Sequence, residues 1–117
     1  MNHIELGQKG EDLATNHLIG KNYEIVDRNY RFRNAEVDII CKKEEKLIFV
    51  EVKTRHSAAI GEPYKAVTRK KQQQIIKVAN HYIEQNDSND EVRLDVISIV
   101  LNQFEMRLEH IEDAFTP

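Results

Sequence analysis

Apolar residues recur along the chain at two different spacings, and each spacing predicts a type of secondary structure. From Ile4 to about Gly20 they recur at helical intervals, and a glycine is a typical residue to end a helix. Residues 70–86, KKQQQIIKVANHYIEQN, have the same period and predict a second helix. Segments rich in β-branched and aromatic residues predict strands at 23–32, 36–42, 46–54 and 92–101, and a short further strand in the tail 104–115.

This order of elements, αβββαβ with one more strand in the tail, predicts an α/β domain with a mixed β-sheet flanked by helices. The length of 117 residues predicts one domain over 1–117, large enough for a single core. The chain has no apolar run near the roughly 20 residues of a membrane span, and no secretory signal pattern at its start. A single cysteine, Cys41, cannot form an internal disulfide, so we expect a cytoplasmic protein.

Three carboxylates and an amine interrupt the apolar pattern of the hairpin predicted at 36–54. Alternate side chains of a strand share a face, so Glu36 lies beside Asp38 on one strand, and Glu51 beside Lys53 on the next. With the turn centred on residues 44 and 45, Asp38 lies opposite Glu51, and Glu36 lies opposite Lys53. The pairs nearer the turn are then Ile40 with Phe49 and Lys42 with Leu47.

Two opposed carboxylates repel each other, and partial burial increases the repulsion. A divalent cation held by Asp38 and Glu51 would neutralise it, because Mg²⁺ prefers oxygen ligands. Lys53 beside such an ion could orient water or stabilise charge on a phosphate oxygen. The alternative is an exposed hairpin face with cross-strand ion pairs, in particular Glu36 with Lys53.

Polar residues on the packing faces of both helices favour the metal site. Glu11 lies on the same helical stripe as Ala14, where an apolar residue is expected. Gly7 and Gly10 would allow this helix to approach the sheet closely. Gln72 occupies a comparable position on the second helix, so we expect a cleft shared by both helices and the hairpin.

The net charge of −3 conceals a basic segment. Residues 53–71 contain six Lys or Arg and one acid, and a second basic group is formed by Arg28, Arg31 and Arg33. Acids gather later in the chain, at Glu84, Asp87, Asp90, Glu91, Asp95, Glu105, Glu109, Glu112 and Asp113. A domain with a basic and an acidic side could bind a polyanion; the alternative is that the lysines and arginines form a solvated helix face.

A spacer of twelve residues separates Asp38 from the segment EVK at 51–53. This pattern resembles the short PD-(D/E)xK nuclease signature. The wider pattern is more specific and follows nearly the whole chain in order: GQKGEDLA, NYRFRNAEVDII, LIFVEVKTR, GEPYKAVTRKKQQQI, LDVISI and EDAF. Together these segments resemble the YraN-like family of small bacterial proteins. That family is similar in fold to archaeal Holliday-junction resolvases and restriction endonucleases, and its members are described as predicted endonucleases. The resemblance therefore implies a restriction-endonuclease-like fold.

The resemblance also implies roles for individual residues. Asp38 and Glu51 match the metal-binding acids, Glu11 matches an additional acid from the first helix, and Lys53 matches the catalytic lysine. Glu36 matches an accessory acid, although alanine replaces the glycine that usually precedes it. The implied contacts with the nucleic-acid backbone are Arg31, Arg33, Arg55, Lys65, Arg69, Lys70, Lys71 and Gln72.

The function that these observations predict is metal-dependent hydrolysis of DNA phosphodiesters, with Mg²⁺ or Mn²⁺ as the cofactor. No recognition helix or zinc finger is evident, so branched or flapped DNA is expected rather than a particular base sequence. A symmetric junction would suit a homodimer. The alternatives are a non-catalytic nucleic-acid-binding module with the same fold and a structural adaptor that binds neither DNA nor metal.

Other candidate residues are expected to be structural. The five histidines show no paired metal spacing, so a zinc site is not expected, and His56 is expected in an exposed loop. Cys41 is predicted to share the face of Val37, away from the acids, and to be part of the core. Tyr30 and Tyr64 are expected to be partly buried rather than stacked on bases.

Overall fold

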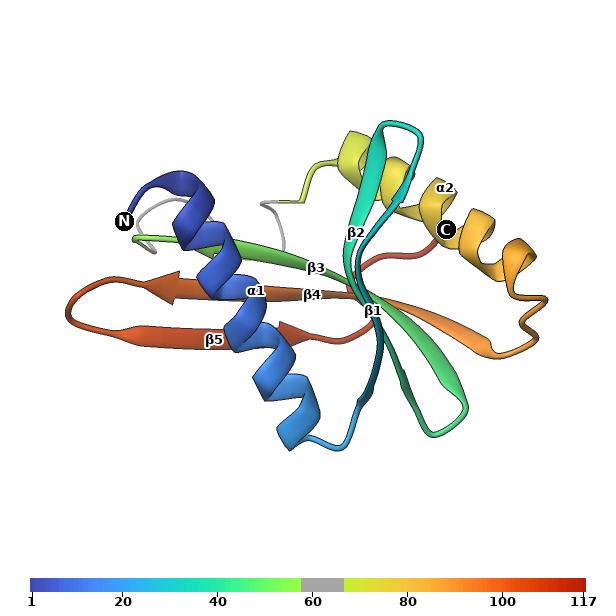
Figure 1. The fold of residues 1–117 in the computed structure, drawn as a ribbon, viewed down its shortest axis with the longest axis horizontal. Coiled ribbons are helices and arrows are strands. Elements are labelled where there is room, and N and C mark those ends of the chain that lie inside the picture. Colours follow the sequence, from blue (N-terminus) through green and yellow to red (C-terminus); the bar gives the residue numbers. More distant parts are fainter. Residues whose placement is uncertain (58–66) are drawn as a thin grey trace.

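The computed structural model describes residues 1–57 and 67–117, and its elements follow the predicted order (Figure 1). Each predicted helix or strand lies within one residue of its expected limits, and the tail contains the additional strand. The helices are α1 (His3–Gly20) and α2 (Arg69–Gln85), and the strands are β1 (Glu24–Phe32), β2 (Ala35–Lys43), β3 (Lys46–Arg55), β4 (Glu91–Leu101) and β5 (Met106–Ile111).

The described strands form one mixed sheet in the order β1-β2-β3-β4-β5. Neighbours are antiparallel except β3 and β4, which run parallel. A parallel pair needs a long crossover connection, and α2 lies in that connection. The prediction of an α/β domain with a mixed sheet flanked by helices is confirmed, in an arrangement compatible with the restriction-endonuclease-like fold.

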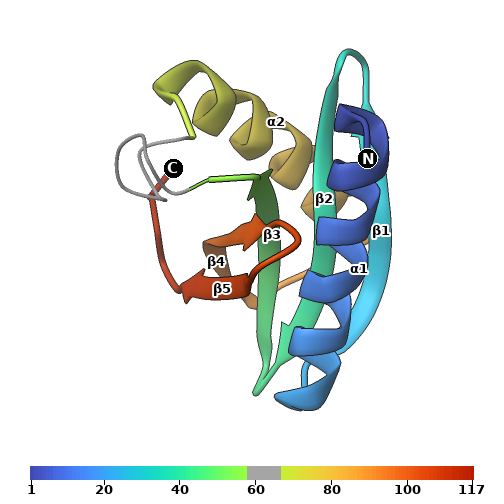
Figure 2. The same cartoon turned by 90° about the vertical axis from the view of Figure 1, so that its left-hand side faces the viewer.

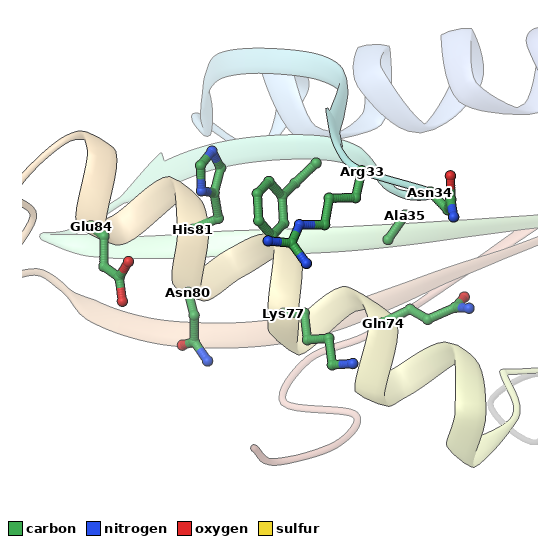
Figure 3. A pocket seen from close by; sticks show the side chains of 9 residues that line it. Arg33, Asn34, Ala35, Gln74, Lys77, Asn80, His81 and Glu84 are labelled. Atoms are coloured by element: carbon green, nitrogen blue, oxygen red, sulfur yellow. The ribbon is translucent and has the colours of Figure 1, made fainter.

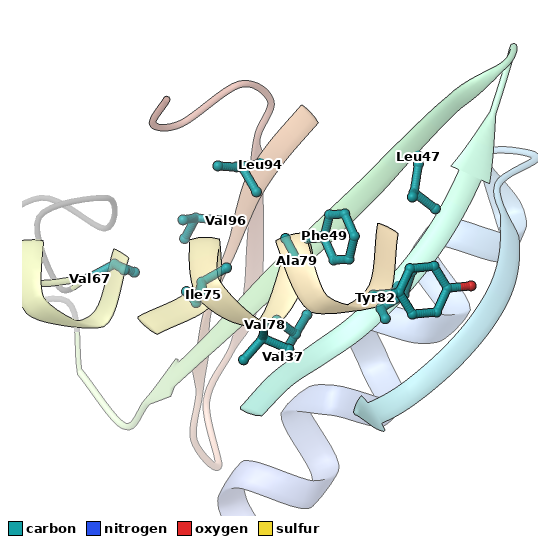
Figure 4. Packing of buried hydrophobic residues seen from close by; sticks show 11 residues of the cluster. Val37, Leu47, Phe49, Val67, Ile75, Val78, Ala79, Tyr82, Leu94 and Val96 are labelled. Atoms are coloured by element: carbon teal, nitrogen blue, oxygen red, sulfur yellow. The ribbon is translucent and has the colours of Figure 1, made fainter. Parts of the chain in front are cut away.

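The two helices cover opposite faces of the sheet, so β3 is buried on both sides (Figure 2). Leu47 and Phe49 pack under α2 in the same cluster as Ile75 (Figure 4). Ile48 and Val50, which alternate with them, pack under α1. A strand buried on both faces has a continuous apolar run, which explains the sequence LIFV in β3.

Gly10 determines how closely α1 approaches β3. A Cβ atom at Gly10 would collide with the side chain of Thr54, whereas a Cβ atom at Gly7 would meet nothing within 4 Å. The close approach expected of both glycines therefore occurs only at Gly10. Ile4, at the start of the predicted stripe, is 73% exposed, and the buried residues of α1 are Leu6, Gly10, Ala14, Thr15 and Leu18.

Asp95 is the centre of a buried polar network and does not belong to the acidic surface that the sequence predicted. Its side chain is 0% exposed. Arg93 donates to both carboxylate oxygens, at 2.9 and 2.8 Å, and His110 Nε2 lies 2.8 Å from Oδ2. Arg93 also donates to the Tyr23 hydroxyl at 2.8 Å. These contacts tie β4 to β5 and to the segment after α1.

Candidate active site

β2 and β3 separate at the point where the carboxylates lie. The predicted pairs nearer the turn are confirmed: Ile40 with Phe49 and Lys42 with Leu47. The ladder ends with Ile39 and Val50, so Asp38 and Glu51 do not form the next ladder pair. Instead, the backbone N–H of Val52 donates to Asp38 Oδ2 at 2.8 Å. This hydrogen bond fixes the Asp38 carboxylate beside the opening.

The alternation of side chains along β2 breaks at the same place. Val37 packs with Ile40 under α2, although the two residues are three positions apart, and Ile39 packs under α1. Opposite this break, Asn29 of β1 has a left-handed backbone with φ of 54°. The prediction that Val37 shares a face with Cys41 is therefore wrong, whereas the predicted burial of Cys41 is confirmed.

Glu51 is the most buried acid of the hairpin, with an exposure of 9%. Its Oε2 lies 3.6 Å from Lys71 Nζ, while its buried Oε1 has no hydrogen-bond partner among the described residues. Burial, followed by the charge and hydrogen bond of Asp38, raises the pKa of Glu51 to about 9, and Lys71 offsets only part of this. Additional positive charge is therefore needed to keep the carboxylate ionised at neutral pH.

Glu11 approaches the same region from α1. With its nitrogen turned toward the acids, the Asn29 amide lies 2.9 Å from Glu11 Oε1 and 3.1 Å from Glu36 Oε1. Arg28 Nη2 lies 3.9 Å from Glu11. Burial and then the charge of Asp38 raise the pKa of Glu11, against the lowering effect of Arg28. Asp38 thus repels one acid on each side of the sheet.

Glu36 is paired with β1 rather than with β3. Arg31 Nε donates to Glu36 Oε2 at 2.7 Å. The ladder between β2 and β3 ends before it reaches Glu36, so the predicted pairing of Glu36 opposite Lys53 is wrong. Lys53 is exposed and lies on the same face of β3 as Glu51, two residues away.

The donor set of Asp38 and Glu51 fits a divalent cation of the magnesium type. It combines two neighbouring carboxylates with an unpartnered buried oxygen, and such ions are often bound through only one or two carboxylates plus water. Within residues 1–57 and 67–117, no group of three or more His, Cys, Asp or Glu side chains is arranged to hold a metal. The role of metal ligand implied for Glu11 stays a prediction.

The basic residues implied to contact DNA have different environments. Lys71 contacts the Glu51 carboxylate, and Gln72 Nε2 donates to the Val67 carbonyl at 3.1 Å, at the start of α2. Arg31, Arg33, Arg69 and Lys70 are exposed, and Arg55 is half-buried at the end of β3. Lys65 and Tyr64 lie outside the described residues.

Two contacts at the site were missed in the sequence: the Asn29 bridge between two acids, and the ion pair of Lys71 with Glu51. Asn29 could have been noticed because it is an asparagine inside a strand pattern. Asparagine tolerates a left-handed backbone, so its presence can indicate an irregularity in the strand. The expectations for His56 and Tyr30 are confirmed. His56 is exposed, and Tyr30 is half-buried with its ring centroid 5.3 Å from that of Tyr82.

In the described part of the chain, neither α1 nor α2 combines the length and the apolar character that crossing a membrane requires.

A mixed sheet between two helices, with acids gathered where two strands separate, defines a small α/β protein, compatible with a nuclease-like fold. The chain belongs to the uncharacterised protein family UPF0102, whose family model matches residues 10–99. It is 49% identical over 113 residues to a UPF0102 protein of Christiangramia forsetii, covering 97% of this chain and 95% of that protein. It is 44% identical over 116 residues to a UPF0102 protein of Clostridioides difficile, covering 98% of this chain and 100% of that protein. The family indicated by the sequence motifs is confirmed.

Proposed function

We propose that this protein is a metal-dependent endonuclease that hydrolyses DNA phosphodiesters with Mg²⁺ or Mn²⁺. The observation that carries the proposal is the environment of Glu51. Its carboxyl group is buried beside Asp38, and one of its oxygens has no partner among the described residues. A buried pair of acids destabilises a fold unless a cation compensates the charge, so a bound ion would explain why two acids lie here.

Asp38 and Glu51 would hold the ion. When bound, the ion would lower the pKa of a coordinated water and neutralise charge on the phosphoryl group. Asp38 is already oriented by the Val52 N–H at 2.8 Å. Glu11, held by Asn29 on the α1 side, would accept a hydrogen bond from water in the site.

The two lysines would have different tasks. Lys53, on the same face as Glu51 and exposed, would contact the scissile phosphate and stabilise the negative charge that develops on its oxygen. Lys71, with its ammonium 3.6 Å from Glu51 Oε2, lowers the pKa of Glu51 and so favours the ionised ligand. Lys71 is therefore a positioning residue.

The substrate we propose is branched or flapped DNA in the cytoplasm, bound mainly through its phosphates. The exposed residues Arg31 and Arg33 of the β1–β2 hairpin, and Arg69 and Lys70 at the start of α2, would supply these contacts. Phosphate contacts give affinity and salt dependence but carry no sequence information. A four-way junction has two equivalent cleavage positions, which a homodimer would reach together.

The test is cleavage of end-labelled linear, flapped and four-way-junction DNA with Mg²⁺ or Mn²⁺. Wild type is compared with Asp38→Asn and Lys53→Ala, and with Glu45→Gln as a control, because Glu45 is an exposed acid in the β2–β3 turn. We expect cutting by wild type and the control, and a loss of about 10²-fold or more in the two site variants. If wild type binds these DNAs and leaves all of them intact with either ion, the non-catalytic binding module becomes the better description.

A further inference from the structure

A groove outside the acidic site lies between the β1–β2 turn and the exposed side of α2 (Figure 3). Its volume is about 460 Å³. Arg33 from the turn and Lys77 from α2 both line it, together with Gln74, Asn34 and Asn80, which supply amide groups. The groove is therefore lined by two cations and several hydrogen-bond donors.

The Arg33 side chain packs against a pair of stacked rings. The rings of Phe32 and His81 have centroids 3.8 Å apart and an interplanar angle of 12°. The Arg33 guanidinium carbon lies 5.1 Å from the centroid of the Phe32 ring. A guanidinium held over an aromatic face keeps its N–H donors available to an anion at its edge. The stack therefore orients a cation into the groove.

Arg33 occupies a position that normally favours glycine. Phe32 pairs with Ala35, so Arg33 and Asn34 form a two-residue turn. Arg33 has φ of 57°, a left-handed conformation, and the first position of such turns is usually glycine when its φ is positive. An arginine at this position works against the hairpin, which indicates that the guanidinium has another use.

A row of polar residues joins the start of α2, where Lys71 contacts Glu51, to the groove. Lys70, Gln74, Lys77 and His81 follow one another at intervals of three or four residues and so share one side of the helix. Seven residues of helix, from Lys70 to Lys77, span about 10 Å.

We propose that this groove binds the phosphate backbone of DNA beside the phosphodiester at the acidic site. The proposal rests on the proposed function and extends it, since it names a second place at which the DNA backbone is bound. Arg33 and Lys77 would each contact a phosphate, and the amide of Gln74 would donate to a phosphate oxygen. Glu84, the acid that lines the far end of the groove, would repel the backbone and so limit the contact.

The test measures binding of a labelled duplex in EDTA, so that no cleavage occurs, over a range of salt concentrations. The variant is Arg33→Gly with Lys77→Gln. Each phosphate contact contributes about 0.9 to the slope of log K against log salt. Loss of two contacts should make the slope shallower by about 1.8 and weaken binding roughly 30-fold at 0.15 M salt. Arg33→Gly also suits the turn, so the variant should keep or raise its unfolding midpoint.

The matched control is Lys21→Gln with Arg107→Gln, which removes the same charge from exposed residues that do not line the groove. We expect its slope and affinity to equal those of wild type. If the Arg33/Lys77 variant matches wild type, or if the control loses as much, the groove proposal is overturned while the nuclease proposal stands. If wild type itself binds none of the DNAs with salt-dependent affinity, the proposed function fails, and the groove proposal fails with it.

Discussion

Glu51 Oε2 lies 3.6 Å from Lys71 Nζ, while the other oxygen of the same carboxyl group is buried without a partner among the described residues. One ammonium therefore compensates only part of the charge that Glu51 and Asp38 bring into the sheet. This imbalance relates the stability of the fold to the chemistry proposed for the site, because the same two carboxyl groups determine both.

Replacement of Glu51 by glutamine should stabilise the metal-free protein. The pKa of Glu51 in the folded state, about 9, is above its ordinary value of 4.5, so the native state favours the protonated form. Its contribution to stability is fully present below about pH 4.5 and is lost as pH rises toward 9. We expect Glu51→Gln to raise the free energy of unfolding by about 1–3 kcal/mol at pH 7. Denaturant titrations in EDTA at pH 5, 7 and 8.5 should show the difference growing with pH. Equal stabilities at all three values would contradict the pKa shift.

Binding of a divalent ion should make the ionised Glu51 carboxylate stabilise the fold rather than destabilise it. The proposed Mg²⁺ or Mn²⁺ would bind the folded state through Asp38 and Glu51, so millimolar ion should raise the melting temperature of wild type. Neither Asp38→Asn nor Glu51→Gln should respond, whereas Glu45→Gln should respond as wild type does. Differential scanning fluorimetry with and without EDTA gives this answer independently of any cleavage. A shift that persists in both site variants would place the ion elsewhere.

Substitution of Gly10 should displace α1. An added Cβ atom collides with Thr54, and overpacking of this kind costs about 1–3 kcal/mol. Because Glu11 is the next residue, Gly10→Ala should also lower any nuclease activity. Gly7→Ala is the matched control: its Cβ meets nothing within 4 Å, and it should stabilise the helix by about 0.5–1 kcal/mol. Equal effects of the two substitutions would show that the close approach at Gly10 is unimportant.

Asp95 should contribute to stability through its buried contacts. Burial alone would raise its pKa, but His110, Arg93 and the backbone N–H of Asp113 hold the pKa of Asp95 below its ordinary value of 3.8. Its contribution is therefore present above about pH 4 and is lost as pH falls through the depressed value. We expect Asp95→Ala to cost about 3–5 kcal/mol at pH 7, because Arg93 and His110 would both lose the buried carboxylate that they share.

A surface pair provides the comparison for Asp95. Glu105 and Arg107 form an exposed ion pair at 3.4 Å, so Glu105→Ala should change the free energy of unfolding by less than about 1 kcal/mol. Urea titrations measure the free energy of unfolding of both variants and wild type at pH 7 and pH 3. At pH 7, Asp95→Ala should be much less stable than Glu105→Ala. At pH 3, the stability of Asp95→Ala should be closer to that of wild type. A small effect of Asp95→Ala at pH 7 would mean that the network is replaceable.

The positions of helices and strands were predictable because each segment has its own apolar period. The pairing register of β2 with β3 near their turn was predictable from the position of the turn, and the observed pair of Ile40 with Phe49 agrees with it. The end of the ladder at Ile39 and Val50 was not predictable, since side-chain parity does not tell where two twisted strands separate. For the same reason, the sequence assigned Val37 to the wrong face.

Partners of the charged residues were harder to predict than their positions. The sequence placed Lys53 on the same face as Glu51, two residues away. The ammonium in contact with Glu51 comes instead from Lys71, on a helix that packs there only in the folded state. In the sequence, Asp95 cannot be distinguished from an acid on the surface. Its burial follows from the contacts of Arg93, Tyr23 and His110 around it. Contacts between distant elements therefore account for what local patterns could not show.

The parallel pairing of β3 with β4 bears on the order of events during folding. The acids of the site lie on α1, β2 and β3, and we expect the β2–β3 hairpin to form early because its contacts are local in sequence. Two residues beside Glu51, Lys71 of α2 and Val96 of β4, come later in the sequence. The repulsion between Glu51 and Asp38 therefore becomes costly only after most of the sheet has formed. Relief of this repulsion should slow unfolding far more than it accelerates folding, so a bound ion would lengthen the lifetime of the native state.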